Sequence, residues 1–373
     1  MRILYLNSDP GVPLFGTKGA SVHVRAMANA LAGLGHDVAV LAARTGGTPE
    51  RAPRFVVLPP FAPRGDSSMP DAAAAEERDM VLDRQHLPAI VAAARLFAPD
   101  LIYERYALWG RAGVDAAHAL AVPHVLEVNA PLALESQRYR GLHHVSMAED
   151  TARHAFGGTA ALLAVSTSVA DYARATGAPP ERVHLFPNAV DARPFEHLPG
   201  RAATSDFTLG FCGSLRPWHG LEDLAEIFLR VAQVTPGARL LVVGDGPERA
   251  AFQRRLLLGG INGAAIFTGA VPHHEVPARL AQMDVALAPY PRLEPFYFSP
   301  LKVFEYQAAG LPVVASRQGD LTRMVRDGHT GFLYEPGDVA SAASLVLALH
   351  AEPVLRARVG TAAREAVLRE HTW

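Results

Sequence analysis

The sequence predicts two consecutive doubly wound α/β domains, each built on a mainly parallel sheet. A chain of 373 residues and 39.9 kDa exceeds the size at which one hydrophobic core stops growing, about 250–300 residues. Short β-branched runs alternate with longer amphipathic stretches along the chain, which is the pattern of βαβ units. The alternation stops after residue 186, where Pro, Gly and Ser become frequent, and restarts near residue 207. We therefore expect an N-terminal domain over 1–190, a linker over 191–206 and a C-terminal domain over 207–373.

The first domain is expected to begin with a strand, because its first apolar run is too short for a signal peptide and ends at polar Asn7. A helix should follow, since Val22, Ala26, Ala30 and Leu34 recur at a spacing of four and form one buried face. The same reasoning predicts strands at 2–7, 37–42, 54–58, 100–103, 123–128, 161–165 and 182–186, and helices at 19–34, 83–97, 108–121 and 167–176.

The first domain also contains an alanine tract, residues 72–75, which is interpreted as the start of a loop or of a surface helix.

The second domain repeats the alternation of strands and helices. It is predicted to have strands near 207–212, 239–243, 264–268, 284–288, 312–315 and 331–334, with helices between them.

Composition excludes several classes of protein. The longest apolar runs, such as residues 160–165, are far shorter than the about 18–20 residues of a membrane-spanning helix. The formal net charge of -2 argues against a nucleic-acid-binding protein, which normally carries a basic excess. The single cysteine, Cys212, allows no intrachain disulfide and is interpreted as a small core residue. We expect a cytoplasmic protein.

Ligands of open parallel sheets bind at the carboxyl ends of strands, so the loops that lead into helices are the candidate sites. The first such loop contains Gly16, Lys18 and Gly19, which allow close backbone approach to an anion at a helix N-terminus. A purely structural turn is the alternative. The loop does not match G-x-G-x-x-G, so a dinucleotide site is disfavoured.

The second loop opens the C-terminal domain at the equivalent place, over residues 213–220. Ser214, Arg216, His219 and Gly220 combine a cation, a titratable ring and a flexible backbone just before a helix, which suits a diphosphate. A rigid turn with Trp218 packed on the domain is the alternative interpretation.

The third loop leads into a helix with Ser299 as the expected N-cap and Pro300 as its first residue. The free amides of Leu301 and Lys302 would then face a ligand at the positive end of the helix. Lys302 is one of only two lysines, with Lys18, and its compact charge suits a phosphate. Glu305 shares its helix face: the pair is either a surface ion pair, or a phosphate contact with a carboxylate that holds a sugar diol.

Several segments closely resemble the retaining glycosyltransferases of family four, which have the GT-B fold. The resemblance runs from one end of the chain to the other in motif order, which makes it more specific than any single glycine loop. The matching segments are 19–25 (GASVHVR), 126–132 (LEVNAPL), 211–220 (FCGSLRPWHG), 243–247 (VGDGP), 267–272 (FTGAVP), 302–314 (KVFEYQAAGLPVV) and 327–333 (DGHTGFL).

The resemblance implies two Rossmann-like domains facing across a cleft, with a nucleotide-sugar donor on the C-terminal domain and a glycan, lipid-linked or small-molecule acceptor on the N-terminal one. It implies same-face displacement at the anomeric carbon, without a metal or a further cofactor. Lys302 and Arg216 would act on the diphosphate and Asn129 on the sugar. Glu305 would hold the ribose and Val271 the base, while the loop that carries Gly16 and Gly19 would close over the phosphates.

The chain departs from the family pattern in four respects. The earlier of two glutamates eight residues apart is here Tyr297, and the Arg and Lys of the phosphate loop are Ser214 and His219. A histidine after the fifth strand is here Asn129, which can form hydrogen bonds with a sugar but cannot titrate; a structural loop amide is the alternative. Family members usually continue through a further C-terminal helix, so the chain is expected to end early.

The remaining candidates are weaker. The pairs His143–His144 and His273–His274 lack the spacing of a helical zinc site and are expected to be solvated surface, so no metal site is predicted. Glu127 and Glu135 flank Asn129, and either lines the acceptor site or, for Glu135, forms a salt bridge. A sugar-nucleotide epimerase and a non-catalytic nucleotide-sugar-binding protein remain as alternatives. Contact with a membrane surface and the oligomeric state stay open.

Overall fold

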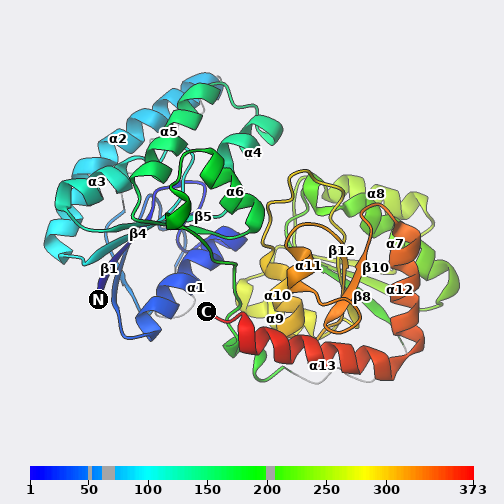
Figure 1. Ribbon diagram of the computed structural model, residues 1–373. Coiled ribbons are helices and arrows are strands. Elements are labelled where there is room, and N and C mark those ends of the chain that lie inside the picture. The colour runs from blue at the N-terminus through cyan, green and yellow to red at the C-terminus, as the bar shows by residue number, and fades with distance from the viewer. Residues whose placement is uncertain (49–52, 61–71, 199–205) are drawn as a thin grey trace. The chain divides into compact units, whose positions relative to one another are not determined.

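The computed structural model describes residues 1–48, 53–60, 72–198 and 206–373, and it forms two compact units, Met1–Pro187 and Asn188–Trp373 (Figure 1). Residues 199–205 of the predicted linker lie outside the described part. Residues 188–198, which include the first part of that linker, cluster by contacts with the C-terminal unit. A short 3-10 helix, Arg193–Phe195, inserts the Phe195 ring into the core of that unit, so one aromatic residue anchors a segment whose composition is typical of a linker.

The N-terminal unit contains a seven-stranded parallel sheet in the order β3-β2-β1-β4-β5-β6-β7, flanked by helices. Each predicted strand of this unit is present. The strands of the unit are β1 (Arg2–Asn7), β2 (Asp37–Ala42), β3 (Val56–Val57), β4 (Leu101–Arg105), β5 (His124–Val128), β6 (Ala161–Ala164) and β7 (Val183–Leu185), and its helices are α1 (Gly19–Gly33), α2 (Ala72–Phe97), α3 (Ala112–Leu120), α4 (Leu132–Tyr139), α5 (Val145–Gly158) and α6 (Thr167–Ala175).

Several helices of this unit differ from the prediction. The predicted buried face of α1 is wrong, because Leu34 is exposed and the helix buries Val24, Met27 and Ala28 instead. The alanine tract begins α2, which starts eleven residues before the expected position of 83. Helices α4 and α5 were not predicted. Most of the residues that α5 buries are small, namely Ala148, Ala152 and Ala155, and such side chains contribute little to a hydrophobic pattern. Helix α4 has only eight residues, too few for a clear period.

The C-terminal unit contains a six-stranded parallel sheet in the order β10-β9-β8-β11-β12-β13. All six strands were predicted. They are β8 (Thr208–Cys212), β9 (Arg239–Val243), β10 (Ala265–Gly269), β11 (Val285–Ala288), β12 (Val313–Ser316) and β13 (Gly331–Tyr334), and the helices are α7 (Leu221–Val234), α8 (Arg249–Leu258), α9 (Val276–Leu280), α10 (Leu301–Ala308), α11 (Leu321–Met324), α12 (Val339–Ala351) and α13 (Pro353–Glu370).

Both faces of this second sheet are buried, which explains its continuous apolar strands. Leu240 and Val242 pack with residues of α7, α8 and α12, whereas Leu241 and Val243 pack with residues of α9, α10, α11 and α13. This alternation follows from the two-residue period of a strand. The sheet is therefore a rigid layer, and the loops at its carboxyl end are held from both sides.

The strand order reverses at β1 in the first sheet and at β8 in the second, where a later strand joins the opposite side. Ligands of doubly wound sheets bind at such reversal points. The loops after β1 and β8 are two of the three loops that the sequence analysis selected. The third loop follows β11, which pairs with β8.

Candidate functional site

The principal candidate site is a buried ammonium group in the first turn of α10. Lys302 is only 8% exposed, and its Nζ has no hydrogen-bond partner among the described residues. Nζ lies 4.2 Å from the centroid of the Phe211 ring and 5.5 Å from that of Tyr290. Burial lowers the pKa of Lys302 to about 7, against smaller opposite effects of Cys212 and Glu305. A buried cation without an acceptor is a suitable site for an anion.

The loop after β8 passes directly beside this ammonium group. A Cβ placed on Gly213 would lie 2.9 Å from Nζ of Lys302, and the φ of Gly213, +139°, is one that other residues rarely adopt. Gly220 closes the loop with a φ of +67°, and a Cβ there would lie 1.5 Å from the carbonyl oxygen of Pro289. Glycine is therefore required at both positions, for close approach to Lys302 and to the loop after β11.

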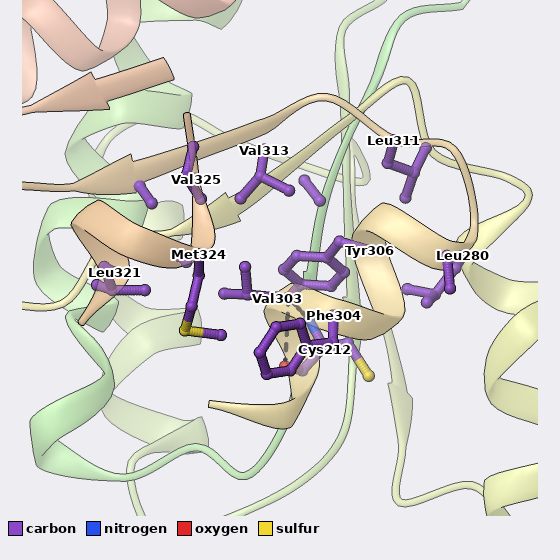
Figure 2. Close-up of a cluster of buried hydrophobic side chains, with 14 of the residues drawn as sticks. Cys212, Leu280, Val303, Phe304, Tyr306, Leu311, Val313, Leu321, Met324 and Val325 are labelled. Atoms are coloured by element: carbon purple, nitrogen blue, oxygen red, sulfur yellow. Dashed lines mark hydrogen bonds between the residues drawn. The ribbon is translucent and has the colours of Figure 1, made fainter. Parts of the chain in front are cut away.

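A buried tyrosine fixes α10 against the end of β8. The hydroxyl of Tyr306 accepts a hydrogen bond of 2.7 Å from the backbone N–H of Cys212, and its ring lies in the apolar cluster that also contains Val303 and Phe304 (Figure 2). Cys212 is itself buried, and burial raises the pKa of its thiol to about 12, so the prediction of an inert core cysteine is confirmed. The Tyr306 contact holds Lys302 beside the loop that begins one residue after Cys212.

The polar residues of this loop differ in their charge. Nδ1 of His219 donates to the carbonyl oxygen of Ser214, which can only accept, so Nε2 of the neutral ring has no proton. Burial and the charge of Lys302 lower the pKa of His219 well below its usual value. Arg216 is exposed, with its guanidinium carbon 5.8 Å from the centroid of Trp218. In the ligand-free protein the loop therefore contributes one exposed cation and a neutral imidazole.

The carboxylate of Glu305 is held by the loop after β10. Its Oε1 lies 2.8 Å from Nε2 of His273, two residues after Val271, whose side chain packs on the core of the unit. The prediction that both histidine pairs are solvated surface holds for His143 and His274, which are exposed, and is wrong for His273 and for His144, whose carboxylate partner is Glu76 at 3.0 Å. Neither partner is close in the sequence, so no local pattern indicates these contacts.

The prediction that Ser299 is the N-cap of α10 is also wrong. Pro300 has the extended dihedrals φ -75° and ψ 111° and occupies the N-cap, so the helix begins at Leu301. The hydroxyl of Ser299 instead accepts from the backbone N–H of Asn188 at 3.2 Å, and Asn188 Nδ2 donates to the Ser299 carbonyl oxygen at 2.5 Å. Leu301 and Lys302 remain first-turn residues, whose amides have no partner within the helix.

Hydrogen bonds to backbone carbonyl groups hold the predicted phosphate loop of the N-terminal unit, among them two that Arg25 donates to Leu14 and Gly16. Nζ of Lys18 donates to the carbonyl oxygen of Gly11 at 3.1 Å, and the N–H of Gly16 donates to that of Pro13 at 3.0 Å. Gly19 is the first residue of α1. Lys18 is exposed, in contrast to Lys302.

A second buried charge lies in the N-terminal unit, at the end of β5. Glu127 is completely buried, and its Oε2 accepts from the hydroxyl of Tyr103 at 2.6 Å. Its Oε1 accepts from Nδ2 of Asn129 at 2.5 Å and contacts Nε2 of His23. Burial alone would raise the pKa of Glu127, but His23, the charge of Arg105 and the Tyr103 hydroxyl lower it to about 2. Glu127 therefore does not line an open acceptor site.

The N-terminal unit also contains a pocket of about 260 Å³, at the carboxyl ends of β1, β2 and β4. On one wall Asp83 of α2 accepts from the backbone N–H groups of Arg111 and Ala112, and burial raises its pKa to about 7. Arg140, which also lines the pocket, forms a 2.5 Å salt bridge with Glu135. The other lining residues include Ser8, Asp9, Arg44, Asp79, His86, Trp109 and Ser136.

Metal sites and membrane-spanning helices can be judged over the described residues, 1–48, 53–60, 72–198 and 206–373. These ranges contain no group of three or more His, Cys, Asp or Glu side chains that is arranged to hold a metal ion. No single helix in them is long and apolar enough to cross a membrane; α12 and α13 reach that length and composition only together, and they are bent by 105°.

Two family models cover most of the chain. "Glycosyltransferase Family 4" matches residues 17–193 and "Glycosyl transferases group 1" matches residues 206–352. The glycogen synthase of Mycobacterium tuberculosis is 26% identical over 100% of this chain and 92% of its own length. The phosphatidyl-myo-inositol mannosyltransferase of Mycobacterium leprae is 33% identical, over 50% of this chain and 49% of its own length.

Solved structures share the fold. Sucrose-phosphate synthase from Thermosynechococcus elongatus superimposes with a TM-score of 0.75 at 19% identity, and covers 100% of this chain and 96% of its own. Anabaena HepE, solved in complex with UDP, has a TM-score of 0.71 at 18% identity with the same coverage. The predicted GT-B fold, with its two doubly wound units, is confirmed.

Proposed function

Because the chain belongs to the group 1 glycosyltransferases of family four, we propose that it transfers a sugar from a nucleotide-diphosphate sugar to a glycan, lipid-linked or small-molecule acceptor, with retention of anomeric configuration. The observation that carries this proposal is the ammonium group of Lys302, which is buried beside the glycine loop after β8 and has no acceptor in the described part of the chain. A diphosphate supplies the missing acceptors and the opposite charge.

The chemistry follows from charge development. The bond from the anomeric carbon to the diphosphate breaks, a bond to the acceptor oxygen forms on the same face, and the acceptor proton passes to a phosphate oxygen. Negative charge then builds on the diphosphate, where Lys302, the first amides of α10 and a reoriented Arg216 stabilise it. No metal or further cofactor is needed in this scheme. Bound diphosphate would also favour protonation of His219, which then donates to it.

The other predicted residues have narrower proposed roles. Glu305 accepts from the ribose hydroxyls through the oxygen that His273 leaves available, and the backbone near Val271 contacts the base. Ser214, Gly220, Ser299 and Leu301 shape the phosphate loops. Gly16, Lys18 and Gly19 are proposed to bind the phosphates of the donor.

The acceptor is proposed to bind in the pocket of the N-terminal unit. Asp83, Asp79 and Arg44 offer hydrogen bonds to a polyhydroxylated molecule. The reaction is assigned to the cytoplasm, where nucleotide sugars are used. A lipid-linked acceptor would add contact with a membrane surface.

Binding and product analysis test the proposal. Thermal shift with UDP-glucose, GDP-mannose and ADP-glucose should identify one stabilising donor, since ligand at about 100 times its dissociation constant adds about 2.7 kcal/mol. Lys302→Ala should lose that shift. Arg230→Ala is the matched control, because Arg230 is an exposed cation of the same unit, on α7, paired with Glu226. An anomeric proton spectrum of the product reports retention, and activity in EDTA reports metal independence.

Three results would refute the proposal. If no nucleotide sugar stabilises the protein, the proposed donor site is refuted. Interconversion of a sugar nucleotide without an acceptor would instead identify an epimerase. Donor binding without transfer to any acceptor and without slow hydrolysis would identify a binding protein.

A further inference from the structure

The side-chain amide of Asn129 has one polar atom bonded and one without a partner. Nδ2 donates to Oε1 of Glu127 at 2.5 Å, while Oδ1 is buried and has no hydrogen-bond partner among the described residues. Buried polar atoms are almost always paired, so a native structure must account for such an oxygen. Asn129 directly follows β5, at the carboxyl edge of the sheet, where ligands of parallel sheets bind.

The orientation of this amide is determined by Glu127. Asn129 lies one residue beyond β5, and the hydrogen bond from its Nδ2 to Oε1 shows that its side chain lies against that of Glu127. An ionised carboxylate can only accept, and rotating the amide by half a turn would place its oxygen against Oε1. Glu127 is 0% exposed, and its carboxylate is fixed on its other oxygen by the Tyr103 hydroxyl at 2.6 Å.

We propose that Glu127 is a positioning residue for the transfer reaction, which holds Nδ2 of Asn129 so that Oδ1 is the atom offered to a sugar hydroxyl. The inference rests on the proposed glycosyl transfer and specifies one step of it. Asn129 then accepts a hydrogen bond from the ligand and does not donate one. The hydroxyl belongs either to the transferred sugar or to the acceptor, and both present the same donor chemistry.

A double-mutant cycle tests the coupling between the two residues. Glu127→Gln and Asn129→Ala should each lower kcat for transfer from UDP-glucose, or from GDP-mannose if the panel selects it, by about tenfold, the effect of one hydrogen bond. The double variant should be no worse than Asn129→Ala, because Glu127 acts only through the amide. The affinity for UDP or GDP alone should remain unchanged in all three.

Asp284→Asn is the matched control. Asp284 is also buried, and its Oδ2 accepts from the backbone N–H of Thr208 at 2.7 Å, but it lies at the amino ends of β8 and β11, away from the carboxyl ends that carry the candidate sites. It should lower the melting temperature as Glu127→Gln does, yet leave kcat at the wild-type value. Additive losses in the double variant, or equal losses of kcat in Asp284→Asn, would overturn the inference.

Two readouts keep the test decisive if Glu127→Gln folds poorly. Asn129→Asp retains an oxygen acceptor but has no N–H for Glu127, so we expect the same tenfold loss; wild-type transfer by this variant would contradict the inference. The side-chain amide protons of Asn129 should also exchange slowly with solvent in the intact protein, and fast exchange would show that Glu127 does not hold them.

Hydrolysis of the donor without acceptor identifies the source of the hydroxyl. If Oδ1 contacts the transferred sugar, Asn129→Ala should slow hydrolysis and transfer alike; if it contacts the acceptor, only transfer should slow. Both results support a hydroxyl donor to Oδ1. A wild-type protein that neither binds nor turns over any nucleotide sugar would refute the proposed function. Additive losses of kcat in the double variant of an active enzyme would refute only the inference on Glu127, so the two failures are distinguishable.

Discussion

Glu127 and Lys302 are both buried charged groups near the carboxyl edge of a parallel sheet, but their partners differ. Three side chains surround the carboxylate of Glu127, two of them as hydrogen-bond donors, whereas Nζ of Lys302 has two aromatic rings and no acceptor among the described residues. Their pKa values shift accordingly: the partners of Glu127 lower its pKa and stabilise the charged form, whereas burial lowers the pKa of Lys302 and stabilises the neutral form. Removing one partner of a satisfied buried charge destabilises the fold, whereas a bound ligand can supply the partner that an unsatisfied charge lacks.

The largest effect is expected from Glu127→Gln on stability. Removing one partner of a buried charged network should lower the free energy of unfolding by about 3 kcal/mol near neutral pH. The pKa of Glu127 falls from 4.5 to about 2 on folding, so the carboxylate stabilises the fold fully above about pH 4.5, and this contribution is lost as the pH falls toward 2. Denaturant titrations should therefore show a difference between variant and wild type that shrinks in acid. A difference independent of pH would contradict the comparison.

Lys302→Met should have opposite effects on binding and on stability. We expect a loss of about 100-fold in affinity for the donor, as for charge-assisted hydrogen bonds to phosphate. The free energy of unfolding should rise by about 1 kcal/mol, because an apolar side chain replaces an unpaired buried cation. Calorimetric titration and chemical denaturation measure the two effects. A destabilised variant would mean that Lys302 has a structural partner.

Gly213→Ala tests the close approach of the loop to Lys302. The new methyl group would displace Nζ, and we expect about a tenfold loss of donor affinity. Gly263→Ala is the control, because Gly263 also has a positive φ, +78°, but no atom within 4 Å of its added Cβ. Both variants should lose about 1 kcal/mol of stability for backbone strain. Equal donor affinities in the two would show that the spacing at Gly213 is unimportant.

The smallest effect is expected from pH. Lys302 loses its proton near pH 7 in the free protein, and a bound diphosphate requires the charged form, so affinity for the donor should fall about fivefold from about pH 7 to pH 8. Lys302→Arg should bind with little dependence on pH, because arginine stays charged. The intact donor suits this measurement, since its diphosphate does not titrate in that range. If the affinity of the wild type does not change between pH 7 and pH 8, the pKa of Lys302 does not lie near 7.

The architecture was predictable because hydrophobic periodicity is a local property. Strand residues such as Leu240 and Val242 alternate with Leu241 and Val243, and this pattern is visible in the sequence itself. The three candidate loops could likewise be selected from glycine positions and from the rule that ligands bind after strands. The alanine-rich α5 was missed, since small buried side chains give a weak pattern.

The contacts of the site were less predictable. His273 and Glu305 are 32 residues apart, and Tyr103 and Glu127 are 24 apart, so neither pair has a signature in the order of residues. Ser299 fits the composition of an N-cap, but its hydroxyl bonds Asn188, 111 residues away, and the extended Pro300 takes the cap position. Such hydrogen-bond partners depend on which distant segments the fold brings together.

The sequence alone determined the two parallel-sheet units, the family, and the presence of a lysine at the start of a helix after a strand. Only the tertiary structure decided that Lys302 is buried without an acceptor among the described residues, and that Glu127 is buried with two side-chain donors and His23. Strand and helix patterns arise from neighbours along the chain, whereas burial and pairing arise from distant segments that pack together. The interaction energy of a charged group depends on that packing, because burial lowers the dielectric constant around the charge.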